Sequence, residues 1–272
     1  PSTVRVQARP DAGLEASGTD AQRAHVAAIF ESQAGPAIDI EWVGPDTLLL
    51  GTHFFRRMLR LVDELQPSRT RVRHAFVTGG AGIDDEWASV FAEHRVVARI
   101  GLDGPRRLHD ADRVPREGWS SFDDAVAAVE LLRRRDVDVD LRCSVRPANV
   151  GSPLTVYRFL CSRCDSPSIE FVPLVVGDGI VAGPGSVDPH RWGAFLIAVF
   201  DTWVTHDVAE VVVSNFDDAL EAFMEGGVER GAGALSAGDR AFHAHIEQPM
   251  RTMVRLCAEG RFPEEIMTLH EH

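Results

Sequence analysis

The strongest constraint on the fold is a regular alternation of short β-type runs with longer amphipathic runs. β-branched and apolar residues gather in the short runs, and capping residues open the longer ones. The expected strands cover residues 3–8, 37–43, 72–77, 96–102, 137–145, 169–176 and 210–213. The expected helices cover residues 19–33, 52–65, a segment opening at Asp84, 120–135, 152–162, 188–206 and 216–225. Short connections between such units favour a parallel sheet with helices outside it.

Six or seven strand–helix units fit a full or partial (β/α) barrel. A dinucleotide-binding fold is disfavoured, because no glycine-rich fingerprint opens the first helix. In such barrels the chemistry lies at the carboxyl ends of the strands, so candidate residues are sought there. The pattern weakens from Gly226 on. We therefore expect a barrel over residues 1–225, followed by a linker and a short C-terminal segment over residues 226–272.

The charge balance excludes several classes of function. The net charge is −13, so no general electrostatic attraction draws nucleic acid or an anionic membrane to the chain. All 28 basic residues are arginine. A Schiff-base lysine and a phosphate-binding lysine are therefore both excluded.

Cysteine usage predicts a reduced, cytoplasmic setting. The four cysteines are too few and too scattered for a disulfide scaffold; they are Cys143, Cys161, Cys164 and Cys257. No apolar run approaches the ~20 residues that span a bilayer. We also see no basic and apolar segments of a secretory signal at the start of the sequence.

Several segments resemble, in order, the motifs of radical S-adenosylmethionine (SAM) enzymes with a SPASM extension. "IDIEWVGPDTLLLGTHFF" is similar to the segment with the Gly-Gly-Glu-Pro motif, and "HAFVTGGAGIDDEW" to the Thr-Asn-Gly strand and its helix. "ARIGLDGPRRLHDADRV" is similar to the Ser-Ile-Asp-Gly-Pro segment. The resemblance runs from about Thr19 to Met224 and is strongest to anaerobic sulfatase-maturating enzymes and their peptide-modifying relatives.

This resemblance implies a partial (β/α)6 TIM-like barrel of the radical SAM type, with a short, degenerate SPASM-like remnant after it. The family holds a [4Fe–4S] cluster through Cys-x3-Cys-x2-Cys in the loop after the first strand, since iron–sulfur clusters need clustered thiolates. The corresponding loop here, "ARPDAGLEASGTD", has no cysteine. From this we expect no [4Fe–4S] cluster and no resident cofactor, with weak SAM binding or a His-bound metal left open.

The SAM pocket that the resemblance implies is altered as well. The family's second motif glycine corresponds to Pro45, which has no N–H and a fixed φ. Glycines also replace the family's Asn at Gly79 and Ser at Gly101. The remnant cofactor-binding positions are Gly44, Asp46, Thr78, Asp103 and Asn149.

Asp217 is the candidate catalytic residue. In sulfatase-maturating relatives an acidic residue in the barrel mouth takes the proton of the substrate thiol, and the resemblance assigns that role to Asp217. The alternative is that Asp217 and Asp218 form an acidic pair at a helix N-terminus, where negative charge is favoured.

Three residues near the C-terminus form a candidate metal site: His243, His245 and Glu247. In a strand, alternate residues share a face, so all three side chains would converge. The same alternation is expected of any exposed strand. A second candidate is the Cys161–Cys164 pair, which needs two more ligands to hold a metal and is otherwise a helix-end pair packed against the sheet.

These observations lead to two hypotheses of function. The first is a cluster-less, radical-SAM-like protein whose barrel mouth binds a peptide substrate or partners a maturation enzyme in RiPP-type peptide or natural-product maturation. The second is an enzyme that has repurposed the barrel, with a His/Glu-bound metal or non-radical SAM chemistry. Neither hypothesis involves nucleic acid or a membrane, and both leave homo- and hetero-oligomers open.

Overall fold

The computed structural model describes residues 4–32, 36–44, 47–113, 120–164, 167–176, 183, 185–208, 210–224 and 237–258. By its internal contacts the chain divides into two compact units. Unit 1 comprises Pro1–Gly101 and Asp123–Asp140, and unit 2 comprises Leu102–Phe122 and Leu141–His272. This division does not test the boundary predicted at residue 225, which falls outside the described residues and stays a prediction.

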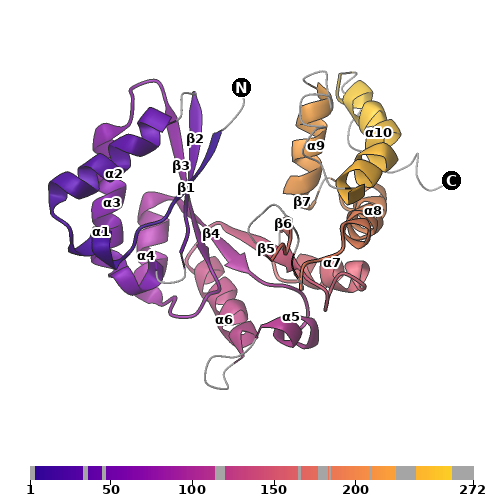
Figure 1. Ribbon diagram of the computed structural model, residues 1–272, viewed down its shortest axis with the longest axis horizontal. Coiled ribbons are helices and arrows are strands. Elements are labelled where there is room, and N and C mark those ends of the chain that lie inside the picture. The colour runs from indigo at the N-terminus through magenta and orange to yellow at the C-terminus, as the bar shows by residue number, and fades with distance from the viewer. Residues whose placement is uncertain are drawn as a thin grey trace. The chain divides into compact units, whose positions relative to one another are not determined.

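Strands and helices alternate along the described chain up to its last two helices, and some successive strands are joined by two helices (Figure 1). The first part runs β1 (Val4–Ala8), α1 (Ala12–Ala16), α2 (Thr19–Ser32), β2 (Ala37–Trp42), η1 (Thr47–Leu50), α3 (Gly51–Leu65), β3 (Arg71–Thr78), α4 (Asp85–His94) and β4 (Val96–Gly101). The second part runs α5 (Arg106–Asp112), α6 (Ser121–Arg134), β5 (Val139–Val145), α7 (Pro153–Cys161), β6 (Ser168–Pro173), α8 (Pro189–His206), β7 (Val212–Val213), α9 (Ser214–Met224) and α10 (Ala237–Ala258).

The strands follow one another in the sheet in the order of the sequence, from β1 to β7. The register of β1 on β2, of β2 on β3, of β3 on β4 and of β6 on β7 is parallel. A helix returns the chain between successive strands, as parallel neighbours require. The predicted α/β class with a parallel, barrel-type sheet is therefore confirmed.

An aromatic cluster forms the core of unit 1. Phe55 of α3 contacts Trp42 of β2 and Phe76 of β3 edge to face, at centroid distances of 5.4 and 5.1 Å. Phe76 also contacts Trp87 and Phe91 of α4, at 5.3 and 5.2 Å. Such pairs stabilise a core beyond the burial of their apolar area. They fix α3 and α4 on one face of the strands, where Figure 1 shows them.

A second aromatic cluster forms the core of unit 2. Phe216 of α9 contacts Phe200 and Trp203 of α8, at 5.2 and 5.1 Å. Phe242 of α10 adds a ring at 5.8 Å from Phe216. Trp192 Nε1 also donates a hydrogen bond to Asp239 in α10, at 2.8 Å. The segment that was expected to be a short appendage therefore contains a long helix, and that helix packs on α8 and α9.

Three short helices were not expected from the sequence: α1, η1 and α5. α1 begins because the Asp11 carboxylate accepts a hydrogen bond from the Leu14 N–H at 2.8 Å. α5 follows a turn in which Gly104 adopts φ +119°, a conformation that favours glycine. β7 is also shorter than expected, because the chain at Glu210 turns back to bond the Asp207 carbonyl.

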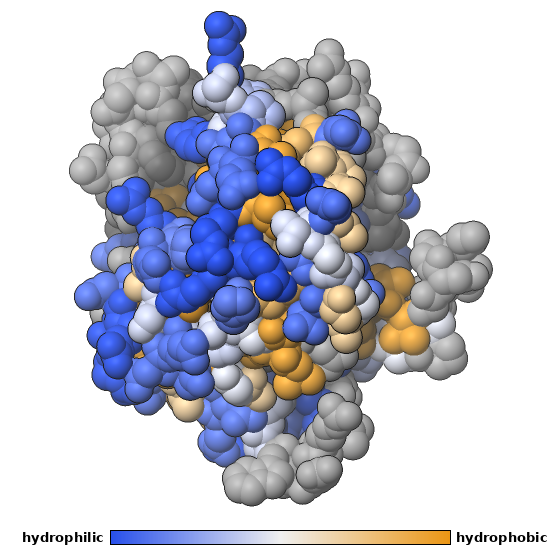
Figure 2. Space-filling view, turned by 90° about the vertical axis from the view of Figure 1, so that its left-hand side faces the viewer, coloured by the Kyte–Doolittle hydropathy of each residue, from blue (hydrophilic) through white to orange (hydrophobic). Residues whose placement is uncertain are grey.

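Hydrophilic residues are the more numerous of the coloured residues on the face shown in Figure 2, and apolar residues are visible between them. Exposed large apolar side chains include Leu49, Val175, Val176 and Val212. Within the described ranges, no helix has the length and apolar character that would let it cross a membrane.

Candidate functional site

At the carboxyl end of β2, Gly44 and Thr47 form a tight turn. The Thr47 hydroxyl donates to the Gly44 carbonyl at 3.3 Å. A Cβ atom added at Gly44 would lie 2.7 Å from Thr47 Oγ1, so a larger residue would push this turn apart. Asp46, the predicted neighbour in the cofactor pocket, lies outside the described residues.

At the carboxyl end of β3, the Thr78 hydroxyl accepts a hydrogen bond from the Gly80 N–H at 3.1 Å. Gly80 has φ +94°, and a Cβ added there would lie 2.8 Å from the Asp124 carbonyl oxygen. The turn after β3 thus needs glycine for two reasons, conformation and close approach. The Thr78 hydroxyl fixes this turn.

Asp103 is the centre of a buried ionic network in unit 2. Its carboxylate has no exposed surface and accepts from Arg113 at 2.9 and 3.2 Å. It also accepts from Arg146 at 3.1 Å and from the Ser144 N–H at 2.8 Å. Two guanidinium groups and a backbone donor surround it, which is the arrangement that a buried charge needs.

Asn149 belongs to the same network and is also fully buried. Its amide nitrogen donates to the carbonyl oxygens of Asp103 and Ser144, at 2.9 and 3.0 Å. Its side-chain oxygen accepts from the Arg146 N–H at 2.7 Å. The structure therefore joins two of the predicted positions, Asp103 and Asn149, in one network that ties together the loops after β4 and β5.

His109 completes this network. The Asp103 N–H donates to His109 Nδ1 at 3.1 Å, while Nε2 lies 3.0 Å from the Ser121 hydroxyl. Burial, together with the nearby charge of Arg113, lowers the pKa of His109 to about 4. The ring is therefore neutral at neutral pH and acts as an acceptor at Nδ1.

Asp217 lies in the first turn of α9 and is exposed. Desolvation raises the pKa of its carboxyl, and the charge of Asp218 raises it further. The helix position matches the charge-pair interpretation. The catalytic role of Asp217 stays a prediction.

The three candidate metal ligands lie on α10, so the strand assumed for them is wrong. On a helix, residues two apart point to opposite sides, which separates His245 from His243 and Glu247. His245 Nε2 lies 2.7 Å from Asp201, and Glu247 accepts from Arg251 at 2.8 Å. Among the described residues no group of three or more His, Cys, Asp and Glu side chains is placed to hold a metal.

The cysteines lie in two places in the described chain. Cys143 is fully buried in β5, and desolvation raises the pKa of its thiol well above the usual value. Cys161 ends α7, and Cys164 follows it by one turn. Both are reduced and half-buried. Burial also raises the pKa of Cys161, to about 11, so it is a thiol rather than a thiolate at neutral pH.

The sheet of unit 1 carries a charged face that no motif in the sequence indicates. We call it the ion-pair face; it consists of Arg5, Asp39, Glu41, Arg73, Arg99 and Asp140. Alternate residues of β2 point the other way, toward α3 and α4, so these charges lie on the face that those helices leave uncovered.

The ion pairs of this face cross between strands. Arg73 donates to both oxygens of Asp39, at 2.7 and 2.8 Å. Arg99 pairs with Glu41 two strands away and with Asp140 at 3.2 Å on the next strand. In the register Ala75 lies opposite Glu41 and Val77 lies opposite Arg99, so the Arg99 side chain reaches Glu41 across β3. Barrel interiors are usually filled with branched apolar side chains, so this face is unusually polar.

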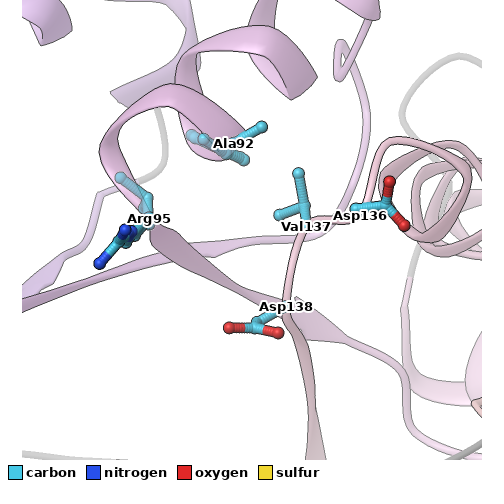
Figure 3. A pocket seen from close by; sticks show the side chains of 7 residues that line it. Ala92, Arg95, Asp136, Val137 and Asp138 are labelled. Atoms are coloured by element: carbon cyan, nitrogen blue, oxygen red, sulfur yellow. The ribbon is translucent and has the colours of Figure 1, made fainter.

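A small cavity of about 110 Å³ lies at the other end of the strands. In Figure 3 the carboxylates of Asp136 and Asp138 flank Val137, and Arg95 lies across from them. Both Arg95 and Asp136 have positive φ, near 50°. The cavity is at the amino ends of β4 and β5, away from the ends that carry chemistry in (β/α) barrels.

Comparison with known proteins agrees with the resemblance seen in the sequence. No protein-family model matches the chain. A serine-type anaerobic sulfatase-maturating enzyme of Bacteroides thetaiotaomicron is 28% identical over 211 residues, which are 72% of this chain and 50% of that protein. A cysteine-type enzyme of Clostridium novyi is 25% identical over 185 residues, 66% of this chain and 49% of that protein. The chain thus spans about half the length of the curated relatives it matches.

Solved structures match in fold. Native anSMEcpe with bound AdoMet aligns with a TM-score of 0.64 and 22% identity, over 78% of this chain and 59% of that one. The same protein with AdoMet and the Cp18Cys peptide aligns with a TM-score of 0.68 and 19% identity, over 84% of this chain and 68% of that one. The predicted partial barrel of the radical SAM type is confirmed.

These comparisons contradict the expectation that no cofactor accompanies this chain. Solved structures of anSMEcpe, which match this chain in fold, contain bound AdoMet, which is SAM. The absence of cysteine in one loop was too narrow a basis for excluding every cofactor.

The segment after β1 is where a thiolate-bound cluster would lie if the chain followed the motif that the resemblance implies. Helix α1 occupies this segment. The Gln22 side-chain amide donates hydrogen bonds to the carbonyls of Leu14 and Ser17, both at 3.1 Å, and so holds the end of α1 against α2. None of residues 8–22 is a cysteine, so this donor set does not fit a cluster held by three thiolates there. No chemical step is therefore assigned to a cluster at this position.

The similarity in sequence and the likeness in fold point the same way, and both cover most of the chain. This chain is similar in sequence to anaerobic sulfatase-maturating enzymes and shares the fold of anSMEcpe.

Proposed function

We propose that this chain is a peptide-binding protein of peptide or natural-product maturation, which presents a peptide or partners a maturation enzyme in the cytoplasm. The observation that carries the proposal is its match to maturating enzymes, one of whose solved structures contains a bound peptide. The chain covers only part of those enzymes, so their whole activity is not transferred to it.

The ion-pair face supports this proposal. The accessible part of this polar face can pair with the charged side chains and backbone groups of a peptide, whereas Glu41 and Arg99, with 1% and 12% of their side chains exposed, are buried beneath it. Arg73 is the most accessible of its paired arginines, with 63% of the side chain exposed, while Asp39 beneath it is 10% exposed. The Arg73 guanidinium can donate hydrogen bonds to a peptide carboxylate while it remains paired with Asp39.

Titration of fluorescently labelled peptides tests the proposal, with the Cp18Cys peptide and charge-altered versions of it as probes. We expect saturable binding that Arg73→Gln weakens by about tenfold, since one charge-assisted pair is worth about 1.5 kcal/mol. Arg23→Gln is the matched control, because Arg23 is also exposed and paired, with Glu64 at 2.8 Å on the helical side of unit 1. Equal effects of the two variants would contradict a role for the ion-pair face.

A second candidate function is AdoMet-dependent chemistry of another kind, favoured by the AdoMet bound in the matched structures. Equilibrium dialysis with labelled AdoMet tests it. Gly44→Ala should reduce binding, because the added Cβ would collide with Thr47 in the turn after β2. If the wild type retains no AdoMet, this second candidate fails while the peptide titration still decides the first.

A further inference from the structure

A cavity of about 280 Å³ opens between α7 and α8 in unit 2. Its lining consists of Tyr157, Arg158, Cys161, Thr202, His206 and Asp207. The volume is close to the lower end for small-molecule sites, and most of the lining groups are polar. Neither the proposed function nor the comparisons give this cavity a role.

One end of the cavity favours a cation. Asp207 follows the last residue of α8, and its carboxylate accepts a hydrogen bond from the buried Tyr157 hydroxyl at 2.8 Å. Within the described parts of the chain, Asp207 has no cationic partner. α7 and α8 both end at this cavity, with Cys161 and His206, so the negative ends of two helix dipoles add to the carboxylate.

The rim of the cavity favours an anion. Arg158 is exposed and lies one turn before Cys161 on α7, and it makes no ion pair with any residue that the structure describes. His206 lies across from it on α8, with Nδ1 held by the Thr202 carbonyl at 3.1 Å. A guanidinium presents a planar fork that suits a carboxylate.

We propose that this cavity binds a free α-amino acid, with its ammonium group beside Asp207 and its carboxylate on Arg158. The ammonium has three donors, which the Asp207 carboxylate and the terminal carbonyls of the helices can accept. The carboxylate stays at the rim, where Arg158 is accessible. The amino acid side chain occupies the remaining volume, next to the half-buried Cys161 thiol.

A thermal-shift screen of the proteinogenic L-amino acids, followed by calorimetry on the best of them, tests this proposal. We expect millimolar or tighter binding to the full chain. The N-acetyl derivative lacks the ammonium and the amide derivative lacks the carboxylate, and each should bind roughly tenfold or more weakly. If no amino acid binds, or if either derivative binds like its parent, the proposal is overturned.

Two variants place the site. Asp207→Asn keeps an acceptor for the Tyr157 hydroxyl but removes the charge, and Arg158→Gln alters an exposed residue without disturbing packing. Both should weaken binding roughly tenfold. Arg163→Gln is the matched control, since that side chain stacks on Phe159 at 4.7 Å and does not line the cavity. An effect of Arg163→Gln equal to that of Arg158→Gln would exclude this location.

A chemical readout is independent of affinity. In a Cys164→Ser/Cys257→Ser background, Cys161 is the accessible thiol, because Cys143 is fully buried. Alkylation at alkaline pH, where the Cys161 thiolate forms, should slow when the amino acid is bound. Unchanged alkylation at a saturating concentration would overturn the placement beside Cys161.

Discussion

At the scale of single residues, the most consequential side chain is Asp103. It was expected as a remnant of a cofactor pocket, and the structure shows that its carboxylate is committed to Arg113, Arg146 and the Ser144 N–H. Every oxygen of this buried carboxylate has a donor. Its role in the fold is thus to hold two arginines and two loops in place.

Replacing Asp103 with alanine should destabilise the protein by about 3–5 kcal/mol, because it leaves two partly buried guanidinium groups without their carboxylate. Urea denaturation followed by circular dichroism measures the change. Exposed Asp201→Ala, which removes only a surface pair with His245, is the control and should cost less than about 1 kcal/mol. Similar losses for both variants would argue against the network.

His74 predicts a pH dependence of stability. Burial lowers its pKa to about 4 in the folded state, from 6.5, and Trp42 Nε1 donates to its Nδ1 at 3.2 Å. The unfolded state therefore binds the proton more readily. The stability contribution of the neutral ring is complete above pH 6.5 and is lost as the pH falls from 6.5 toward 4.

The test compares urea denaturation at neutral pH and at pH about 5. Protonation of His74 in the unfolded state should lower the free energy of unfolding by about 2 kcal/mol between these two conditions. His74→Gln keeps an acceptor for Trp42 but does not titrate. The drop in its free energy of unfolding between the two conditions should therefore be about 2 kcal/mol smaller than that of the wild type. His190→Gln, at an exposed position of α8, should behave like the wild type. Equal pH dependence in all three proteins would contradict a neutral, buried His74.

At the scale of elements, local sequence signals set where helices begin. Asp84 precedes α4, its carboxylate accepts from the Trp87 N–H at 2.9 Å, and Asp85 and Glu86 follow in the first turn. The same chemistry opens α8 at Asp188, whose carboxylate accepts from the Arg191 N–H at 3.0 Å. These caps were readable from the sequence because they depend only on neighbours in the chain.

Asp84→Ala should therefore cost about 1 kcal/mol of unfolding free energy, through the loss of one cap and one favourable dipole charge. Asp84→Asn should cost less, because asparagine still caps. Urea denaturation of the two variants measures the difference. If Asp84→Asn lost as much unfolding free energy as Asp84→Ala, the stabilisation would come from the charge of Asp84 and not from its capping hydrogen bond.

At the scale of the whole molecule, the net charge disfavours polyanionic partners. A net charge of −13 repels polyanions, except where a local cluster of arginines makes part of the surface positive.

We accordingly expect no binding of a labelled DNA duplex, and no sedimentation with vesicles rich in anionic lipid, at physiological salt. Fluorescence anisotropy and co-sedimentation measure these. The labelled peptides of the proposed function serve as positive probes in the same buffer. Salt-sensitive binding to the duplex would show that a local basic surface outweighs the total charge.

The alternation of strands and helices, most of their bounds and the family resemblance were accessible from sequence, because periodicity and capping are local and motifs are contiguous. The ion-pair face was not, since Arg99 and Glu41 are 58 positions apart and meet only through the parallel register. The helical state of His243, His245 and Glu247 follows from packing of α10 on α8 and α9. The amino-acid cavity likewise depends on α7 and α8 ending side by side. Local secondary structure depends on neighbouring residues, whereas a site is formed by residues that lie far apart in the sequence and that folding brings together.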